Sequence, residues 1–366
     1  MRLRIALFLC LVLGGFLQKE NSAAAERDQL TESGRLAFVE RAQVWTATDI
    51  PRMNLREGPG GAGAFRPDEL VTCDYVAGPR SGTTPKFSCA LADGDVVKVR
   101  YGAHNHEVVG SVLATRLLWA LGFAADRVYP VRVRCRGCSS DPWNSRGLAA
   151  ETHDFDQAVI ERKPSGHEMS QGKKRAGWAW KELELIDPAR GGAPQAHRDA
   201  LKLLAVLIQH TDTRPQQQRL LCLPGGLTAD GQCDKPFLVL HDVGKTFGHA
   251  NLFNRMGPGS VNFEAWARTP VWKNQTGCAG NLSKSFTGTL GDPEISEAGR
   301  QFLASLLRQL TDQQLHDMFE VAGVIRRSPG ASAARLASVE EWVAAFNRKR
   351  DEIVSRRCSN VSTNGP

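Results

Sequence analysis

Apolar and polar residues are distributed differently in three parts of the 366-residue chain. Near the N-terminus, two arginines precede an apolar run over residues 5–17. From residue 70 onward, short β-rich pieces alternate with turn-rich segments, and one long segment, residues 106–123, has apolar residues near helical spacing. After residue 163 the balance shifts toward helical segments. The pattern therefore predicts a leader, a β-rich half with one long helix, and a mainly helical half.

The predicted elements can be given by residue number. The predicted strands are 70–76, 88–95, 96–102, 127–135 and 157–163, and a hairpin of residues 219–223 and 235–240 follows later. The predicted helices are 106–123, 197–210, 296–310, 312–324 and 338–356. Residues 26–66 are polar and glycine-rich and are expected to be a loosely ordered lead-in. The expected units of the chain are therefore 1–25, 26–66, 67–163 and 164–366.

The first 25 residues have the composition of a secretory signal peptide. Arg2 and Arg4 precede the apolar run, and three alanines ending at Ala25 form a small-residue cleavage site before Glu26. The run is too short to cross a bilayer, and the sequence holds no other stretch of about 18 apolar residues. We therefore expect a secreted or periplasmic protein with no stable membrane anchor.

Removal of this segment leaves eight of the nine cysteines. An even set of cysteines in an exported chain predicts disulfides. The preferred pairs are Cys73 with Cys89 and Cys222 with Cys233, because each pair joins strands that are expected to be adjacent.

Two further cysteines, Cys135 and Cys138, also allow other chemistry. Their spacing fits one half of a zinc site, but the sequence holds no second Cys-x-x-Cys and no His-x-x-x-His to complete it. A thioredoxin-like redox pair would open a helix, whereas this pair follows a predicted strand. A disulfide is the favoured interpretation.

Composition and charge exclude some classes of protein. With 42% apolar residues, the chain can bury a large core, as one large two-lobed domain or as two ordinary ones, so disorder throughout is excluded. The formal net charge of +7 falls to +5 without the leader, which carries three basic residues and one acidic residue. Because the basic residues are scattered and no run of aromatic residues lies among them, nucleic acid is not expected as a partner.

A glycine-rich loop, residues 78–87, lies between two predicted strands. Gly78 and Gly82 allow a close approach of the backbone to a ligand, as in loops that bind phosphate. The candidate ligand-binding side chains of the loop are those of Ser81, Thr83, Thr84 and Lys86. An ordinary turn between strands is the alternative interpretation.

Lys98 lies among valines in a predicted strand. A buried ammonium group is unfavourable unless it is paired, and Glu107, in the first turn of the next helix, is a candidate partner. The alternatives are a solvated lysine on the outer face of the strand and a glutamate that is favoured at a helix start by the helix dipole.

The segment LIQHTDTRPQQQRLLCL, residues 207–223, interrupts an apolar helix. The helix ends at His210, Asp212 follows on a loop, and Gln217 lies five residues further along. The second strand of the following hairpin leads to Asp242 in HDVGKTFG. We interpret the break as a loop that directs Asp212 and Gln217 into a cleft beside Asp242. An ordinary helix-to-hairpin turn is the alternative.

These segments resemble the protein-kinase-like superfamily. HTDTRPQQ is similar to its His-x-Asp-x4-Asn catalytic loop, and DVG is similar to its Asp-Phe-Gly metal-binding turn. SGTTPKF is similar to the phosphate loop of the HipA-type kinases, and the compact first half resembles secretory-pathway kinases that phosphorylate exported proteins. The resemblance spans roughly residues 70–248. It implies an α+β, two-lobed, protein-kinase-like fold with a β-rich N-lobe, one long helix and a mainly helical C-lobe, here with disulfides.

The resemblance implies a nucleotide site for ATP. Lys98 would contact the α and β phosphates and pair with Glu107. Glu161, in VIERK, would lie at the hinge that contacts adenine through its backbone.

The same resemblance implies an acceptor and metal site. Asp212 would face the acceptor hydroxyl, and Asp242 with Gln217 would bind Mg²⁺ or Mn²⁺. Gln217 stands where the family has an asparagine.

The expected function is therefore that of an exported ATP-dependent phosphotransferase that acts on a protein or a cell-surface acceptor. The alternative is a secreted kinase-like binding protein without turnover, in which the fold and its cysteines serve the recognition of a partner. A small-molecule kinase of the aminoglycoside type fits the loop residues but not the export signal.

Overall fold

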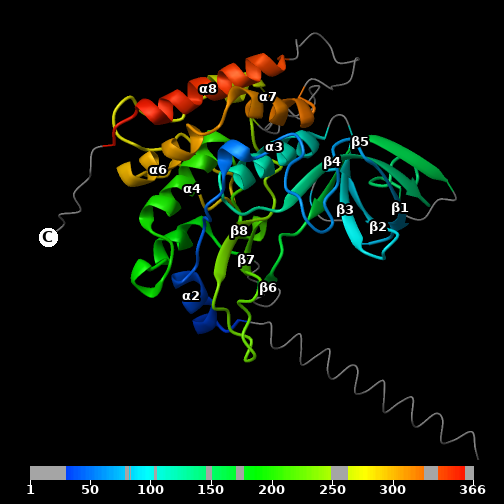
Figure 1. The fold of residues 1–366 in the computed structure, drawn as a ribbon, viewed down its shortest axis with the longest axis horizontal. Coiled ribbons are helices and arrows are strands. Elements are labelled where there is room, and N and C mark those ends of the chain that lie inside the picture. The colour runs from blue at the N-terminus through cyan, green and yellow to red at the C-terminus, as the bar shows by residue number, and fades with distance from the viewer. Residues whose placement is uncertain are drawn as a thin grey trace, which may run out of the picture.

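The computed structural model of the protein describes residues 30–78, 82, 84–102, 105–145, 151–169, 177–248, 263–324 and 337–358. A five-stranded barrel lies at one side of the molecule, and a larger, mainly helical part lies beside it (Figure 1). The predicted signal peptide, residues 1–25, lies outside the described residues.

Five strands form the closed barrel in the order β1-β2-β3-β5-β4. They are β1 (Leu70–Val76), β2 (Lys86–Ala90), β3 (Val96–Tyr101), β4 (Arg127–Arg136) and β5 (Thr152–Arg162). Neighbouring strands are antiparallel except β1 and β4, whose parallel pairing closes the barrel. The sequence pattern predicts all five strands but not the closure.

Helix α3 (His106–Ala120) connects β3 to β4 and lies between the barrel and the helical part (Figure 1). The side-chain oxygen of Asn105 accepts a hydrogen bond from the backbone N–H of Glu107, which satisfies one free donor at the helix start. Gly122, with a left-handed φ of 82°, follows the helix end. Most residues of α3 are buried, because the helix contacts β4 and β5 on one side and α7 on another.

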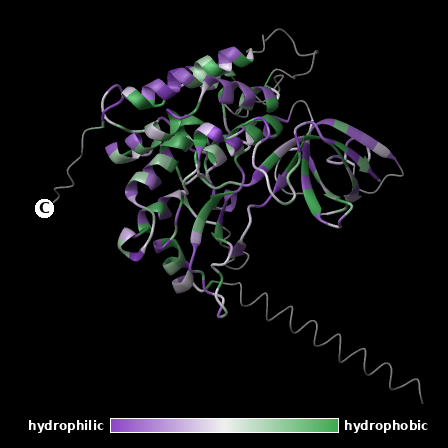
Figure 2. Ribbon diagram, viewed as in Figure 1, coloured by the Kyte–Doolittle hydropathy of each residue, from purple (hydrophilic) through white to green (hydrophobic). Residues whose placement is uncertain are grey.

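The helical part contains a three-stranded antiparallel sheet in the order β6-β7-β8. Its strands are β6 (His167–Met169), β7 (Gln218–Cys222) and β8 (Pro236–Leu240). Its main helices are α4 (Gln195–Leu207), α5 (Phe263–Arg268), α6 (Glu297–Leu307), α7 (Asp312–Val321) and α8 (Val339–Ser355). Hydrophobic and hydrophilic residues alternate along the outer helix α8, as its half-buried position requires (Figure 2).

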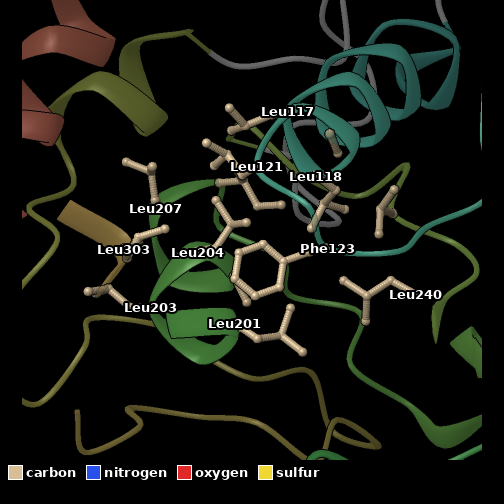
Figure 3. Packing of buried hydrophobic residues seen from close by; sticks show 14 of the residues in the cluster. Leu117, Leu118, Leu121, Phe123, Leu201, Leu203, Leu204, Leu207, Leu240 and Leu303 are labelled. Atoms are coloured by element: carbon tan, nitrogen blue, oxygen red, sulfur yellow. The ribbon is translucent and has the colours of Figure 1, made fainter. Parts of the chain in front are cut away.

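Leucines from α3, α4, α6 and β8 meet in the core of the helical part (Figure 3). Phe123, which follows α3, belongs to the same cluster as Leu204 of α4 and Leu240 of β8. Complete burial of one such side chain stabilises the fold by about 1.5–3 kcal/mol. Since α3 contributes to this core and also contacts the barrel strands, it fixes the barrel to the helical part.

The lead-in segment is not loosely ordered, so that expectation is wrong from residue 30 onward. Residues Glu32–Glu40 form helix α2, whose first turn is capped by the side chain of Thr31. Phe38 and Val39 are buried in the main core. After α2, Gln43 exchanges backbone hydrogen bonds of 2.9 Å with the edge of β8. The apolar residues here are too few to give a periodic pattern, yet they complete the core.

Four disulfides pair all the cysteines outside the predicted signal peptide. The two predicted pairs, Cys73–Cys89 and Cys222–Cys233, are confirmed. The other two pairs are Cys135–Cys138 and Cys278–Cys358. Such a set indicates an oxidising, extracytoplasmic location. Within the described ranges, none of the helices combines the length and the apolar character that a bilayer crossing requires.

Candidate functional site

The loop after α4 and the end of β8 meet at one point of the helical part. His210 is buried behind the loop, and a short 3₁₀ turn, Pro215–Gln217, leads from the loop into β7. The backbone carbonyl of Gln217 accepts hydrogen bonds from the backbone N–H groups of His241, at 2.8 Å, and Asp242, at 3.2 Å. The structure therefore brings the loop residues Asp212 and Gln217 to the segment that carries Asp242, as the sequence suggests.

The Asp212 carboxylate is surrounded by hydrogen-bond donors. Arg214 donates from Nε at 2.7 Å and from Nη2 at 3.0 Å, and the Nζ atom of Lys245 lies 3.2 Å away. The side-chain amide of Gln217 donates to the same carboxylate at 3.2 Å. Burial alone would raise the pKa of Asp212, but the hydrogen bond from Arg214 and the charge of Lys245 hold it below its usual value. Asp212 is therefore ionised at neutral pH.

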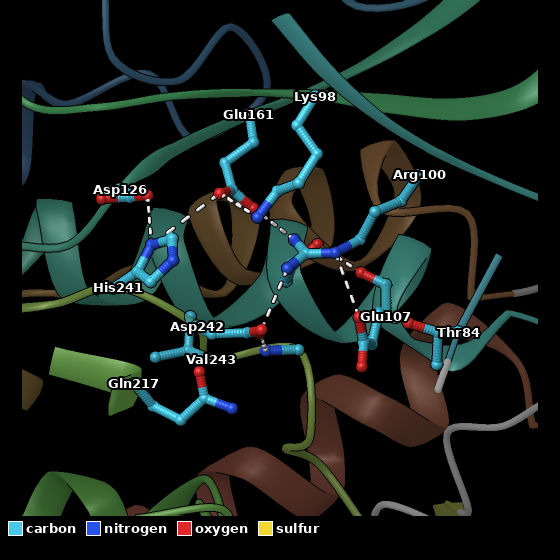
Figure 4. A network of polar contacts seen from close by, with 12 residues as sticks. Thr84, Lys98, Arg100, Glu107, Asp126, Glu161, Gln217, His241, Asp242 and Val243 are labelled. Atoms are coloured by element: carbon cyan, nitrogen blue, oxygen red, sulfur yellow. Dashed lines mark hydrogen bonds and ion pairs between the residues drawn. The ribbon is translucent and has the colours of Figure 1, made fainter. Parts of the chain in front are cut away.

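Arg100 of β3 joins three carboxylates from three separate segments (Figure 4). Its side chain is 1% exposed. The guanidinium nitrogens lie 3.0 Å from Glu107 of α3, 2.5 Å from Glu161 of β5 and 3.2 Å from Asp242. Burial alone would lower the pKa of Arg100, but these carboxylates raise it well above its usual value. Arg100 therefore remains charged and links the barrel, α3 and the segment after β8.

Lys98 forms its ion pair with Glu161 and not with Glu107, so the expected Lys98–Glu107 pair is wrong. Lys98 and Arg100 point to the same face of β3, because side chains alternate along a strand. Arg100 is closer along the chain to the start of α3 and forms the ion pair with Glu107. Lys98 therefore pairs with Glu161. Sequence reasoning missed Arg100, although its position two residues after Lys98 is a usable signal.

Glu161 differs from its expected position at a hinge. It is paired in register with Lys98 of β3 on one side and with Val128 of β4 on the other, so its backbone lies inside the sheet. Its side chain carries the two ion pairs with Lys98 and Arg100 (Figure 4). Burial alone would raise the pKa of Glu161, but the charges of Arg100 and Lys98 lower it to about 2. An adenine contact through this backbone does not fit such a position.

Asp242 is the carboxylate that comes from the segment after β8. Burial alone would raise its pKa, but the charges of Arg100 and Lys98 hold the pKa of Asp242 well below its usual value. Among the described residues, its Oδ1 atom accepts one weak hydrogen bond, 3.3 Å long, from the backbone N–H of Gly244. This oxygen therefore keeps capacity for a further partner.

The glycine-rich loop reaches the same network at its C-terminal end. The hydroxyl of Thr84 donates to Glu107 at 2.7 Å. Burial lowers the pKa of the Lys86 ammonium, and the nearby charges of Glu107 and Asp242 counteract this. Gly82 has a left-handed φ of 80°, and Gly78 is exposed. Ser81 and Thr83 lie outside the described residues.

A second group of polar residues adjoins the first and was not identified from the sequence. Asp126, whose side chain has no exposed surface, accepts a hydrogen bond from the Nδ1 atom of His241 at 2.7 Å (Figure 4). Arg219 of β7 lies 3.3 Å from the same carboxylate oxygen and 2.7 Å from Glu168. Asp126 follows an apolar segment and has no motif around it, so only the fold reveals this group.

A cavity of about 760 Å³ opens beside Lys98, Glu161 and His241. This volume lies in the range of small-molecule sites. Its basic lining residues are Lys98, Arg127, Arg162, Lys163 and Arg219. Its acidic lining residues are Asp93, Asp95 and Glu161. Because basic side chains outnumber acidic ones in this lining, the cavity suits an anionic ligand. Among the described residues of the glycine-rich loop, none lines this cavity.

Comparisons with known proteins give few matches. No protein-family model matches the chain, and no curated protein matches it. Among the solved structures, the chain is similar to the crystal structure of a Helicobacter pylori proinflammatory kinase, CtkA, with a TM-score of 0.43 and 9% sequence identity. The similarity covers 79% of this chain and 96% of that chain.

Proposed function

We propose that the protein is an exported, kinase-like, ATP-dependent phosphotransferase that acts on a protein or a cell-surface acceptor. The observation that carries the proposal is the junction around Arg100 and Gln217. Arg100 binds Glu107, Glu161 and Asp242, and the Gln217 carbonyl holds the backbone of Asp242. Segments that resemble a kinase catalytic loop and a metal-binding turn are thereby joined, and Glu161 and His241 at this junction line the cation-rich cavity.

In this proposal the nucleotide occupies the cavity with its phosphates toward Lys98. The Lys98 side chain is 31% exposed and lines the cavity, whereas Arg100 is inaccessible. Lys98 can therefore exchange its contact with Glu161 for a phosphate oxygen, while Arg100 continues to position Glu107 and Asp242. Because the glycine-rich loop does not line the cavity among the described residues, Lys98 and the basic residues around it are the main phosphate-binding groups.

The residues present fit a hard divalent cation such as Mg²⁺ or Mn²⁺. Asp242 Oδ1 accepts a single long hydrogen bond, from Gly244, within the part of the chain that the structure describes, and the Gln217 side chain offers an amide oxygen on the adjoining segment. Oxygen donors of this kind are those that Mg²⁺ prefers. When bound, the cation would neutralise charge on the phosphates. Asp212, ionised and held by Arg214 and Lys245, would orient the acceptor hydroxyl.

The second candidate function is a secreted kinase-like binding protein without turnover. A specific observation favours it: the carboxylate of Asp212 already accepts hydrogen bonds from Arg214 and Gln217 and an ion pair from Lys245. Both cations lower the basicity of the carboxylate, and a weak base removes a proton from a hydroxyl poorly. In this second function the fold and its cysteines serve the recognition of a partner, and no phosphate is transferred.

The test is Mg²⁺-dependent binding of a fluorescent ATP analogue to the oxidised protein, followed by transfer of labelled phosphate to candidate acceptors. Asp242→Asn should weaken Mg²⁺-dependent binding, whereas Asp74→Asn, on the exposed face of β1, should not. Asp212→Asn should retain binding and reduce transfer by about 100-fold or more, the usual loss for a positioned general base. Binding without transfer would favour the second candidate, and absence of nucleotide binding would contradict the phosphotransferase.

A further inference from the structure

Four cysteines gather inside the barrel from segments far apart in the sequence. Cys73 of β1 and Cys135 of β4 are register partners, Cys89 lies on β2, and Cys138 follows β4. All four are buried, at 0–1% exposure. They form two disulfides, Cys73–Cys89 and Cys135–Cys138, which lie in contact through the sulfurs of Cys89 and Cys135 at 3.8 Å.

The spacing of these sulfurs is that of a tetrahedral metal–thiolate site. With zinc–sulfur bonds of about 2.3 Å, the sulfurs at two corners of a tetrahedron are about 3.8 Å apart. The Cys89 and Cys135 sulfurs already have this separation, and the sulfurs of Cys73, Cys89 and Cys135 all lie within 4.8 Å of one another. The Cys138 sulfur is bonded to that of Cys135, so Cys138 is the fourth candidate ligand once that bond is reduced.

The local chain is also suited to such a site. Cys135 and Cys138 have the Cys-x-x-Cys spacing of structural zinc sites, and Gly137 between them has a left-handed φ of 71° that makes the tight turn. The sequence contains no second Cys-x-x-Cys pair, but the pairing of β1 with β2 and β4 supplies Cys73 and Cys89 in its place. The sequence spacing therefore gives two of the four candidate ligands, and strand pairing gives the other two.

We propose that these four cysteines form a structural zinc site when the chain is reduced. Each disulfide takes two electrons from a dithiol reductant, which becomes a disulfide itself, and the chain then carries four thiols. Zinc displaces one proton from each thiol and forms four zinc–sulfur bonds. In an oxidising compartment Cys73–Cys89 joins β1 to β2, and Cys135–Cys138 closes the turn after β4. In a reducing compartment one ion would hold all three strands together.

Two basic residues of β4 are next to the cysteine ligand Cys135 in the sequence. Four thiolates around Zn²⁺ carry a net charge of −2, and Arg134 and Arg136 flank Cys135. Both arginines are exposed and are bound to Asp154 and Asp74 on the outer face. Their cationic groups therefore lie on the opposite face of β4 from the cluster and do not compete for its sulfurs.

The test uses the full chain without its leader, reduced with a dithiol in the absence of air and then freed of reductant. Zinc content is measured after removal of loosely bound ion, and Co²⁺ is added to a second sample because its visible absorption reports tetrahedral sulfur coordination. We expect one ion per chain and a sulfur-coordinated Co²⁺ spectrum. Absence of bound ion from the reduced chain would overturn the proposal.

Two matched double variants identify the ligands. Cys135→Ser with Cys138→Ser should lose the ion and the Co²⁺ spectrum. Cys222→Ser with Cys233→Ser, which removes the disulfide between the end of β7 and the connection before β8, should keep both. Equal uptake by the two variants would contradict the assignment. If the reduced chain loses its tertiary structure, zinc should restore its near-ultraviolet circular dichroism, and a failure to restore it would also contradict the proposal.

Discussion

At the residue scale, the buried charge of Arg100 connects the segments that form the candidate site. Its side chain is enclosed and faces Glu107, Glu161 and Asp242, whereas Lys98 is partly exposed and faces the cavity. Because Arg100 pairs with three carboxylates at once, its removal is far more costly than the loss of an exposed pair. The two neighbouring cations therefore have different roles, one in stability and one in ligand binding.

Arg100→Ala should lower the free energy of unfolding by about 3–5 kcal/mol, because buried carboxylates lose their partner. Lys98→Ala should change stability by about 1 kcal/mol or less and should weaken binding of the ATP analogue. Urea denaturation measures the first effect, and a binding titration measures the second. Equal loss of stability in the two variants would show that the network does not depend on Arg100.

The buried side chain of His210 should make the stability of the protein depend on pH. It is fully buried, neither ring nitrogen has a hydrogen-bond partner in the described part of the chain, and burial lowers its pKa to about 4. An unfolded histidine has a pKa of about 6.5. Between these values the unfolded chain binds a proton that the folded chain does not, so stability is retained above pH 6.5 and falls as the pH drops toward 4.

His210→Leu should remove this contribution, which amounts to at most about 1.4 kcal/mol for each pH unit in that window. The variant should therefore lose less stability than the parent between pH 6.5 and 4, with little difference in slope above pH 7. Denaturation midpoints measured at each pH give the comparison. Parallel curves for the two proteins would mean that His210 does not titrate as its burial requires.

At the scale of elements, α3 and the segment after β8 pack through two glycines. A Cβ atom on Gly110 would lie 2.4 Å from the carbonyl oxygen of Gly244, and one on Gly244 would lie 2.7 Å from the side chain of Glu107. Such distances are below any normal contact, and the first involves backbone that cannot rotate away. The position of Asp242 relative to α3 therefore depends on this close approach.

Gly110→Ala should destabilise the protein by about 1–3 kcal/mol, because overpacking outweighs the gain in helix propensity of about 1 kcal/mol. It should also weaken nucleotide binding, since the backbone next to Asp242 must move. Gly60→Ala is the control, because a Cβ there meets nothing within 4 Å. Thermal unfolding and the binding titration measure both effects. Identical behaviour of the two variants would contradict the packing argument.

The local elements are much more predictable from the sequence than their assembly. The strands around Cys73 and Lys98, the long helix after Glu107 and the hairpin before Asp242 are all present near their predicted positions. The parallel pairing of β1 with β4 has no local signal, because strands so far apart in sequence meet only through the fold. The choice of Arg100 as the partner of Glu107 likewise depends on the path between β3 and α3.

At the scale of the whole molecule, two large hydrophobic cores and four disulfides stabilise the fold. One core fills the barrel, and the larger one extends from α2 and α3 through the helical part. Two disulfides lie in the barrel, and one joins the end of β7 to the connection before β8. The fourth, Cys278–Cys358, spans 80 residues and attaches the segment after α8 to the segment after α5.

The long disulfide should contribute more to stability than the hairpin disulfide. In the loop-entropy description, a loop of 80 residues corresponds to about 4.5 kcal/mol, and the 11-residue separation of Cys222–Cys233 corresponds to about 3 kcal/mol. Cys278→Ser with Cys358→Ser should therefore lower the melting temperature more than Cys222→Ser with Cys233→Ser. All four positions are buried, so the loss of packing is similar in the two variants. Calorimetry under non-reducing conditions tests the order, and a larger loss from the hairpin pair would show that local strand geometry outweighs chain entropy here.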